Sequence, residues 1–127
     1  MWNSYKGLVD YIAEAYGCVA EIGIGHFPDV ALALVDRGVQ VFATDIKSFR
    51  YKGLKMVVDD ITHPNLSLYT GVHLIYSVRP PLELVPYMER LAKVVAADLI
   101  VRPLTSEYPG GRLIRSGNTS FFLWSNP

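Results

Sequence analysis

Two glycines one residue apart follow a short apolar segment near the start of the chain, in Glu21-Ile22-Gly23-Ile24-Gly25. Glycines in this arrangement let the backbone turn sharply and let a ligand approach the main chain. Phe27 and Pro28 come next and offer no side-chain acceptor to the free amides of the helix expected there, so a ligand could supply one. The third glycine of the dinucleotide fingerprint and the Gly-Lys-Ser/Thr of a phosphate loop are both missing. A plain strand-to-helix turn remains the alternative.

Two acidic residues come at the ends of expected buried strands. A buried carboxylate such as Glu21 is costly unless a donor or a cation meets it. A backbone amide, a lysine or the ammonium group of a bound ligand would each satisfy it. Asp45 follows Gly25 by twenty residues. This spacing places an acceptor where the ribose diol lies in nucleotide-binding doubly wound folds, although aspartate is also a common first residue of turns.

Two arginines each follow an expected strand and each precede a proline, in Arg79-Pro80 and Arg102-Pro103. If the two strands are neighbours, both guanidinium groups point into one crevice, where they can bind a carboxylate or phosphate. Arg79 and Arg102 are therefore the predicted substrate or anion site. In the alternative interpretation each arginine binds local carbonyls or pairs with Glu83 or Glu107.

Residue types that often bind metals or nucleic acids are scattered along the chain. The three histidines lie far apart and no cysteine cluster accompanies them, so no metal site is predicted. Residues 47–55 alternate basic and aromatic side chains, a pattern that can bind nucleic acid by phosphate contact and stacking. Because the formal net charge of the chain is zero, nucleic acid is a possible but not a favoured partner, and a solvated face is the simpler interpretation.

The elements that position these residues follow from hydrophobic periodicity and turn residues. We expect helices at 4–16, 28–36 and 82–96, and strands at 18–22, 39–44, 55–58, 72–77 and 97–101. Gly117-Asn118 predicts a hairpin between 112–116 and 119–124. This alternation predicts an α/β fold: a three-layer, Rossmann-like, doubly wound and mostly parallel sheet of order 3-2-1-4-5, with a C-terminal antiparallel hairpin.

Length and composition limit the class of protein. The chain has 127 residues, half of them hydrophobic, with 12 basic and 12 acidic side chains, which is enough for one core and predicts a single domain over 1–127. One cysteine, Cys18, excludes an internal disulfide and is consistent with a reducing compartment. No apolar run approaches the roughly 20 residues that span a bilayer. We therefore expect a cytoplasmic protein that does not bind membranes.

Three segments resemble the cofactor-binding motifs of class I S-adenosylmethionine-dependent methyltransferases. Residues 19–25 resemble motif I, an acidic residue followed by Gly-x-Gly. Residues 41–46 resemble the motif whose acid holds both ribose hydroxyls, and 57–61 resemble the segment that places an acid at the adenine amine and an apolar residue against the ring. The resemblance implies S-adenosylmethionine as cofactor, held by Glu21, Gly23, Gly25, Asp45, Ile46, Asp60 and Ile61.

The residues after the fourth expected strand differ from the family's pattern. Many members that methylate amines or bases carry Asp/Asn-Pro-Pro-aromatic there, whereas this chain has Ser77-Val78-Arg79-Pro80-Pro81-Leu82. The catalytic residue is therefore unknown, with Ser77 and Arg79 as candidates. The whole chain also resembles the uncharacterised protein family 0146 of archaea, which is similar in fold to methyltransferases and has no established activity.

The function expected from these observations is that of an S-adenosylmethionine-binding, methyltransferase-like protein of unknown acceptor. Its ligand would be a small nucleoside, with an anionic substrate beside it. Two alternatives stay open. Gly-x-Gly and Asp45 are compatible with a small NAD-binding, oxidoreductase-like domain, and a module that binds a partner without catalysis would need neither cofactor.

Overall fold

A seven-stranded sheet in the order β3-β2-β1-β4-β5-β7-β6 forms the centre of the computed structural model, which describes residues 2–104 and 106–126. The strands are β1 Cys18–Ile22, β2 Gln40–Asp45, β3 Lys55–Val58, β4 Leu74–Val78, β5 Asp98–Arg102, β6 Arg112–Ser116 and β7 Thr119–Trp124. The first five run parallel, and β7 pairs antiparallel with both β5 and β6. The predicted strand order and the predicted C-terminal hairpin are therefore confirmed.

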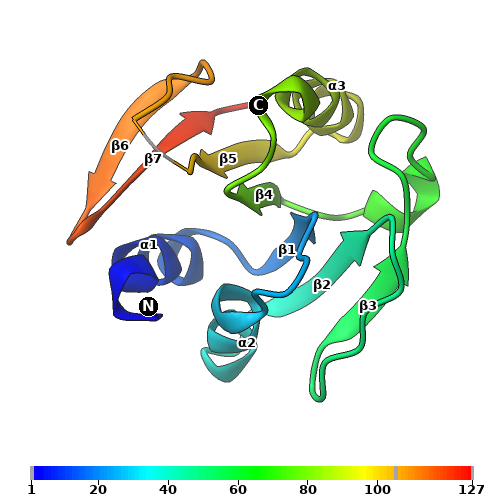
Figure 1. Cartoon of the computed structure of the whole chain (residues 1–127), viewed down its shortest axis with the longest axis horizontal. Helices are drawn as coiled ribbons and strands as arrows, with labels where there is room; N and C mark the ends of the chain where they lie inside the picture. The colour runs from blue at the N-terminus through cyan, green and yellow to red at the C-terminus, as the bar shows by residue number, and fades with distance from the viewer. Residues whose placement is uncertain (1, 105, 127) are drawn as a thin grey trace.

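The helices divide between the two faces of this sheet (Figure 1). Helices α1 (Lys6–Ala15) and α2 (Asp29–Asp36) cover one face, and α3 (Val85–Val95) covers the other. Three short 3-10 helices occur at Trp2–Tyr5, Leu66–Tyr69 and Leu82–Leu84. None of the helices in the described ranges is long and apolar enough to cross a membrane.

Strand alternation determines which face each side chain of the central strands meets. In β1, Val19 packs into the core cluster shared with α1 and α2, whereas Ala20 and Ile22 pack into the cluster shared with α3. In the neighbouring β4, Tyr76 and Val78 face α1 and α2. Glu21 pairs with Tyr76, the residue before Ser77, so the side chains of Glu21 and Ser77 point to opposite faces of the sheet.

Several element boundaries differ from those expected, and two of these differences have a clear local cause. The fourth strand begins at Leu74, because the amide of Val72 donates to the Tyr69 carbonyl in a turn that precedes it. The expected helix at 82–96 is a short 3-10 turn followed by α3. Pro86, which has no amide to donate, lies in the first turn of α3, where no partner is required. The 3-10 helix at Leu66–Tyr69 was not predicted at all.

Helix α1 packs directly on the C-terminal hairpin. Gly7 is buried, and a Cβ atom built on it would lie only 1.8 Å from the carbonyl oxygen of Ser116. Beside this contact the hydroxyl of Thr119 donates to the Ser4 carbonyl at 2.8 Å. A glycine at this point of α1 is therefore required by the close approach of the two backbones.

Candidate functional site

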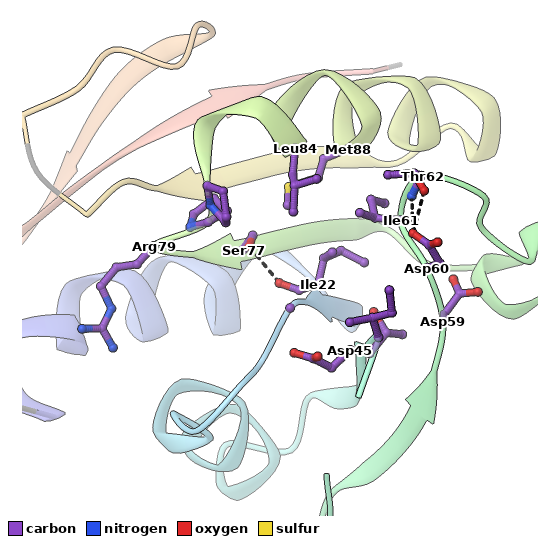
Figure 2. Close-up of a pocket in the computed structure, with 15 residues that line it drawn as sticks. Ile22, Asp45, Asp59, Asp60, Ile61, Thr62, Ser77, Arg79, Leu84 and Met88 are labelled. Carbon is purple, nitrogen blue, oxygen red and sulfur yellow. Dashed lines mark hydrogen bonds between the residues drawn. The ribbon is translucent and has the colours of Figure 1, made fainter. Parts of the chain in front are cut away.

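A cleft of about 440 Å³ opens at the carboxyl ends of β1, β2 and β4, on the side of the sheet covered by α3 (Figure 2). This volume lies within the usual range for small-molecule sites, as does the position at the strand ends. The lining residues are Ile22, Gly23, Thr44, Asp45, Ile46, Asp59, Asp60, Ile61, Thr62, Ser77, Arg79, Pro80, Pro81, Leu84 and Met88. Five of the seven residues expected to hold a cofactor are thus brought to one cleft, and Glu21 and Gly25 are outside its lining.

The glycine loop after β1 leaves its main chain open to a ligand. Gly23 has a φ of +70°, and a Cβ atom there would meet nothing within 4 Å. Its amide is engaged, since it donates to the Thr44 carbonyl at 2.9 Å. Gly25 also has a positive φ, and its amide donates to Asp45 Oδ2 at 3.0 Å. Gly23 therefore borders the cleft, whereas Gly25 orients a residue that lines it.

Asp45 has a fixed orientation at the end of β2. Its Oδ2 accepts from the Gly25 amide and its Oδ1 accepts from the Lys47 amide, both at 3.0 Å. Each carboxylate oxygen retains further lone-pair capacity. The carboxylate can therefore accept hydrogen bonds from two adjacent hydroxyl groups without giving up its own partners. Ile46, beside it, is 66% exposed.

The two consecutive aspartates after β3 have different surroundings. Asp59 uses both oxygens within the protein, accepting from the Asn65 amide at 3.1 Å and from the Tyr69 hydroxyl at 2.7 Å. Asp60 uses only Oδ1, which accepts from the hydroxyl and the amide of Thr62. These two bonds lower the pKa of Asp60 and keep it ionised. Among the described residues, the second carboxylate oxygen of Asp60 has no hydrogen-bond partner at the cleft.

Glu21 lies behind the cleft, and this placement differs from the expectation that its carboxyl meets a ligand. Strand alternation turns it toward α1 and α2, and it pairs in register with Tyr76 of β4. Only 1% of Glu21 is exposed, and the Tyr76 hydroxyl donates to its Oε1 at 2.7 Å. Burial raises the pKa of Glu21 to about 8, against a smaller lowering by that hydrogen bond. Glu21 is therefore a neutral acid inside the protein at pH 7.

The remaining walls of the cleft are mostly apolar, and several of their residues were not expected at a site. Ser77 lines the floor and donates its hydroxyl proton to the Ile22 carbonyl at 2.8 Å, which joins β4 to β1. Pro80, Pro81, Leu84 and Ile61 also line the cleft, and Figure 2 shows Leu84 and Ile61 among the side chains around it. Met88 belongs both to this wall and to the core beneath α3. A Pro-Pro step directly after a strand was the sequence feature that could have identified this wall.

The side chain of Arg79 points away from the cleft, toward α1 (Figure 2). Arg79 has a φ of +57°, and its guanidinium carbon lies 4.9 Å from the centre of the Phe27 ring and 6.0 Å from that of Tyr5. The guanidinium carbon of Arg102 lies 5.8 Å from the centre of the same Tyr5 ring. Within residues 2–104 and 106–126 neither arginine forms an ion pair, so the pairing with Glu83 or Glu107 does not occur there.

The other candidate ligands lie near the glycine loop or apart from one another. In the described part of the chain no three histidine, cysteine, aspartate or glutamate residues are grouped so that they could hold a metal ion. His26 packs edge-on against Phe49 at 4.9 Å. Phe49 stacks on Tyr51, whose hydroxyl donates to the Gly25 carbonyl. The aromatic part of segment 47–55 therefore supports the glycine loop, while its lysines are exposed.

Solved methyltransferase structures share this fold. An S-adenosyl-L-methionine methyl transferase from Silicibacter pomeroyi superposes with a TM-score of 0.59 at 13% identity, covering 100% of this chain and 93% of that chain. The MycE methyltransferase of the mycinamycin biosynthetic pathway, in complex with Mg and SAH, superposes with a TM-score of 0.57 at 11% identity. That alignment covers 94% of this chain and 45% of MycE. At such identities the likeness shows the fold alone.

Sequence relatives come from archaea and extend over most of the chain. A UPF0146 protein of Archaeoglobus fulgidus is 44% identical over 118 residues, which are 91% of this chain and 91% of the relative. The resemblance inferred from the sequence is confirmed by this relative and by a family match that spans residues 5–125. The chain therefore belongs to the uncharacterised protein family UPF0146, with a methyltransferase-like fold.

Proposed function

We propose that the protein binds S-adenosylmethionine in the cleft and transfers its methyl group to an acceptor. The observation that carries this proposal is the pair Asp45 and Asp60. They follow neighbouring strands β2 and β3, line one cleft, and are each held by backbone amides with acceptor capacity to spare. A nucleoside presents matching donors, two ribose hydroxyls and, in adenine, an exocyclic amine.

The residues of the cleft fit the parts of this cofactor. Asp45 would accept from the ribose hydroxyls and Asp60 from the adenine amine. Ile61 and Leu84 both line the cleft and would contact the adenine ring. Gly23, with open space where a side chain would be, would allow the remainder of the cofactor to approach the main chain.

The chemistry at the acceptor would rest mainly on positioning. When bound, S-adenosylmethionine supplies a methyl group activated by a sulfonium. The described residues that line the cleft include no histidine or lysine that could act as a general base. The Ser77 hydroxyl donates its proton to the Ile22 carbonyl. We infer that Ser77 and the backbone at Arg79 orient the acceptor and that the mostly apolar walls exclude water.

Replacing Asp45 with alanine is expected to weaken binding of S-adenosylhomocysteine about 10- to 100-fold. Hydrogen bonds to a charged group contribute about 1.5–3 kcal/mol, which corresponds to that factor. Isothermal titration calorimetry with S-adenosylhomocysteine measures this loss of affinity, and a titration of the parent with NAD tests the alternative. Asp36→Ala, an exposed aspartate on α2, serves as the control and should bind like the parent. If the parent binds NAD and not S-adenosylhomocysteine, the oxidoreductase-like alternative replaces this proposal.

Asp60 is expected to recognise the adenine amine, and a double-mutant cycle can isolate that contact. The parent should lose about tenfold in affinity when the exocyclic amine of S-adenosylhomocysteine is removed, since a charge-assisted hydrogen bond is lost. Asp60→Ala should bind the two compounds equally. Asp59→Ala should still discriminate between them, because both oxygens of Asp59 are used within the protein. Equal discrimination by parent and Asp60→Ala would place the base elsewhere.

A further inference from the structure

Two arginines beside the cleft have almost no polar partners among the residues that the structure describes. The guanidinium of Arg79 forms no hydrogen bond and no ion pair with any described residue. Arg102 donates one hydrogen bond, from Nη1 to its neighbour Pro103. Its Nε is buried and has no hydrogen-bond partner within residues 2–104 and 106–126. A buried donor without an acceptor is costly, so the pair lacks the groups that normally satisfy a guanidinium.

Strand register brings the two arginines together. Arg102 of β5 pairs with Val78 of β4, so the side chains of Arg102 and Val78 face α1 and α2. The amide of Arg79, the residue after Val78, donates to the Arg102 carbonyl at 2.6 Å. Both guanidinium carbons then lie within 6.0 Å of the Tyr5 ring. Aromatic faces attract guanidinium groups, so the Tyr5 ring attracts both cations and the Phe27 ring attracts Arg79, and neither ring neutralises a charge.

A hollow adjoins Arg79, across the end of β4 from the cofactor cleft, and Arg102 lies outside its lining. Its volume is about 420 Å³, and Ile24, His26, Phe27, Val78, Arg79 and Leu104 line it. Arg79 belongs to both cavities. Its side chain leaves the cleft toward α1 (Figure 2), so a molecule in the hollow would meet the guanidinium while its other end lies at the rim of the cleft.

We propose that Arg79 and Arg102 form an anion site that binds the carboxylate or phosphate group of the methyl acceptor. The assignment to an acceptor rests on the proposed function, whereas the anion site itself stands on the two arginines alone. Planar guanidinium groups bind both oxyanions through paired N–H donors. An anion here would supply hydrogen-bond acceptors to Arg79, which has none in the described part of the chain, and would offset the repulsion between the two cations.

Anion binding can be measured without the cofactor. The probes are inorganic phosphate and malonate, titrated at constant ionic strength into the parent, Arg79→Gln, Arg102→Gln and the double variant. The arginine Nε–Hε resonances in NMR spectra report binding. The parent should show saturable shifts at both arginines, and each single variant should bind at least about tenfold more weakly. The double variant should lose little more than either single variant, because both groups hold one ligand.

Controls separate the site from general charge effects. Arg112→Gln removes an exposed arginine from the edge strand β6, two strands away from β5, and should bind both probes like the parent. Arg102→Lys retains the charge at the partly buried position and tests the need for the planar fork. A preference for phosphate over malonate, or the reverse, identifies the acceptor's anionic group. Equal, non-saturable shifts in the parent and the double variant would overturn the anion site.

S-adenosylhomocysteine titrations of the same variants distinguish this inference from the proposed function. Affinity for S-adenosylhomocysteine should stay within about twofold of the parent, since both guanidinium groups point away from the cleft. If the parent fails to bind S-adenosylhomocysteine but binds anions through Arg79 and Arg102, the anion site stands and the methyl-transfer role falls. If S-adenosylhomocysteine binds and neither phosphate nor malonate binds, the anion site is wrong and the cofactor proposal is supported.

Discussion

Replacing Glu21 with glutamine is expected to stabilise the protein by roughly 4 kcal/mol at pH 8 and to leave its stability nearly unchanged at pH 4. The folded protein keeps Glu21 protonated up to a pKa of about 8, because the carboxyl is fully buried. The unfolded chain ionises it near 4.5. Glutamine has nearly the same shape, can accept the Tyr76 hydrogen bond, and carries no charge in either state.

The sign follows from proton uptake. Below pH 4.5 both states hold the proton of Glu21, so the residue contributes no pH dependence. Between pH 4.5 and about 8 only the folded state holds it, and the free energy of unfolding falls by about 1.4 kcal/mol per pH unit. Above pH 8 both states are ionised and the loss stops. The stability contributed by the protonated acid is thus lost as the pH rises.

Urea denaturation of the parent and Glu21→Gln at pH 4, 6 and 8 measures this effect. Other titrating groups act equally on both proteins, so the difference between the two stability curves isolates Glu21. Glu14→Gln, on the exposed side of α1, is the matched control and should give a curve parallel to that of the parent. Parallel curves for Glu21→Gln would mean that the buried carboxyl is ionised in the folded protein.

Replacing Gly7 with alanine is expected to destabilise the protein by about 3 kcal/mol, the upper part of the range for overpacking. Alanine normally favours a helix over glycine by about 1 kcal/mol. At Gly7 that gain is outweighed, because the new Cβ atom would meet the Ser116 carbonyl at 1.8 Å and α1 would have to move off the hairpin.

The urea midpoint of Gly7→Ala, compared with that of Gly17→Ala, tests this prediction. A Cβ atom on Gly17 meets nothing within 4 Å, so that substitution should change the free energy of unfolding by less than about 1 kcal/mol. An increase in stability for Gly7→Ala would show that α1 does not lie so close to β6 and β7.

The strand order and much of the cleft could be predicted because they depend on local sequence patterns. Short apolar segments separated by helical periodicity specify the parallel strands, and Gly117-Asn118 specifies the hairpin. The carboxyl ends of parallel strands meet at one edge. The spacing of Asp45 from the glycines predicted its place there, and the resemblance to methyltransferase motifs implied Asp60 beside it; both line the cleft.

The features that could not be predicted depend on which face of the sheet a residue meets. Glu21 ends a strand that is buried on both sides, so the apolar pattern does not reveal its direction, and only the packing of α1 and α2 determines it. Gly7 is a similar case, since its requirement comes from a strand more than a hundred residues away.

The position of β7 between β5 and β6 has a consequence for how the chain folds during synthesis. Until residues 119–124 have left the ribosome, β5 keeps an unpaired edge, and buried residues such as Leu99 and Val101 lie on it. An open, apolar strand edge is a template for pairing with other chains. The bond from Thr119 to Ser4 likewise forms only when both ends meet. A nascent chain stalled before β7 would therefore be prone to aggregation and slow to reach its native contacts.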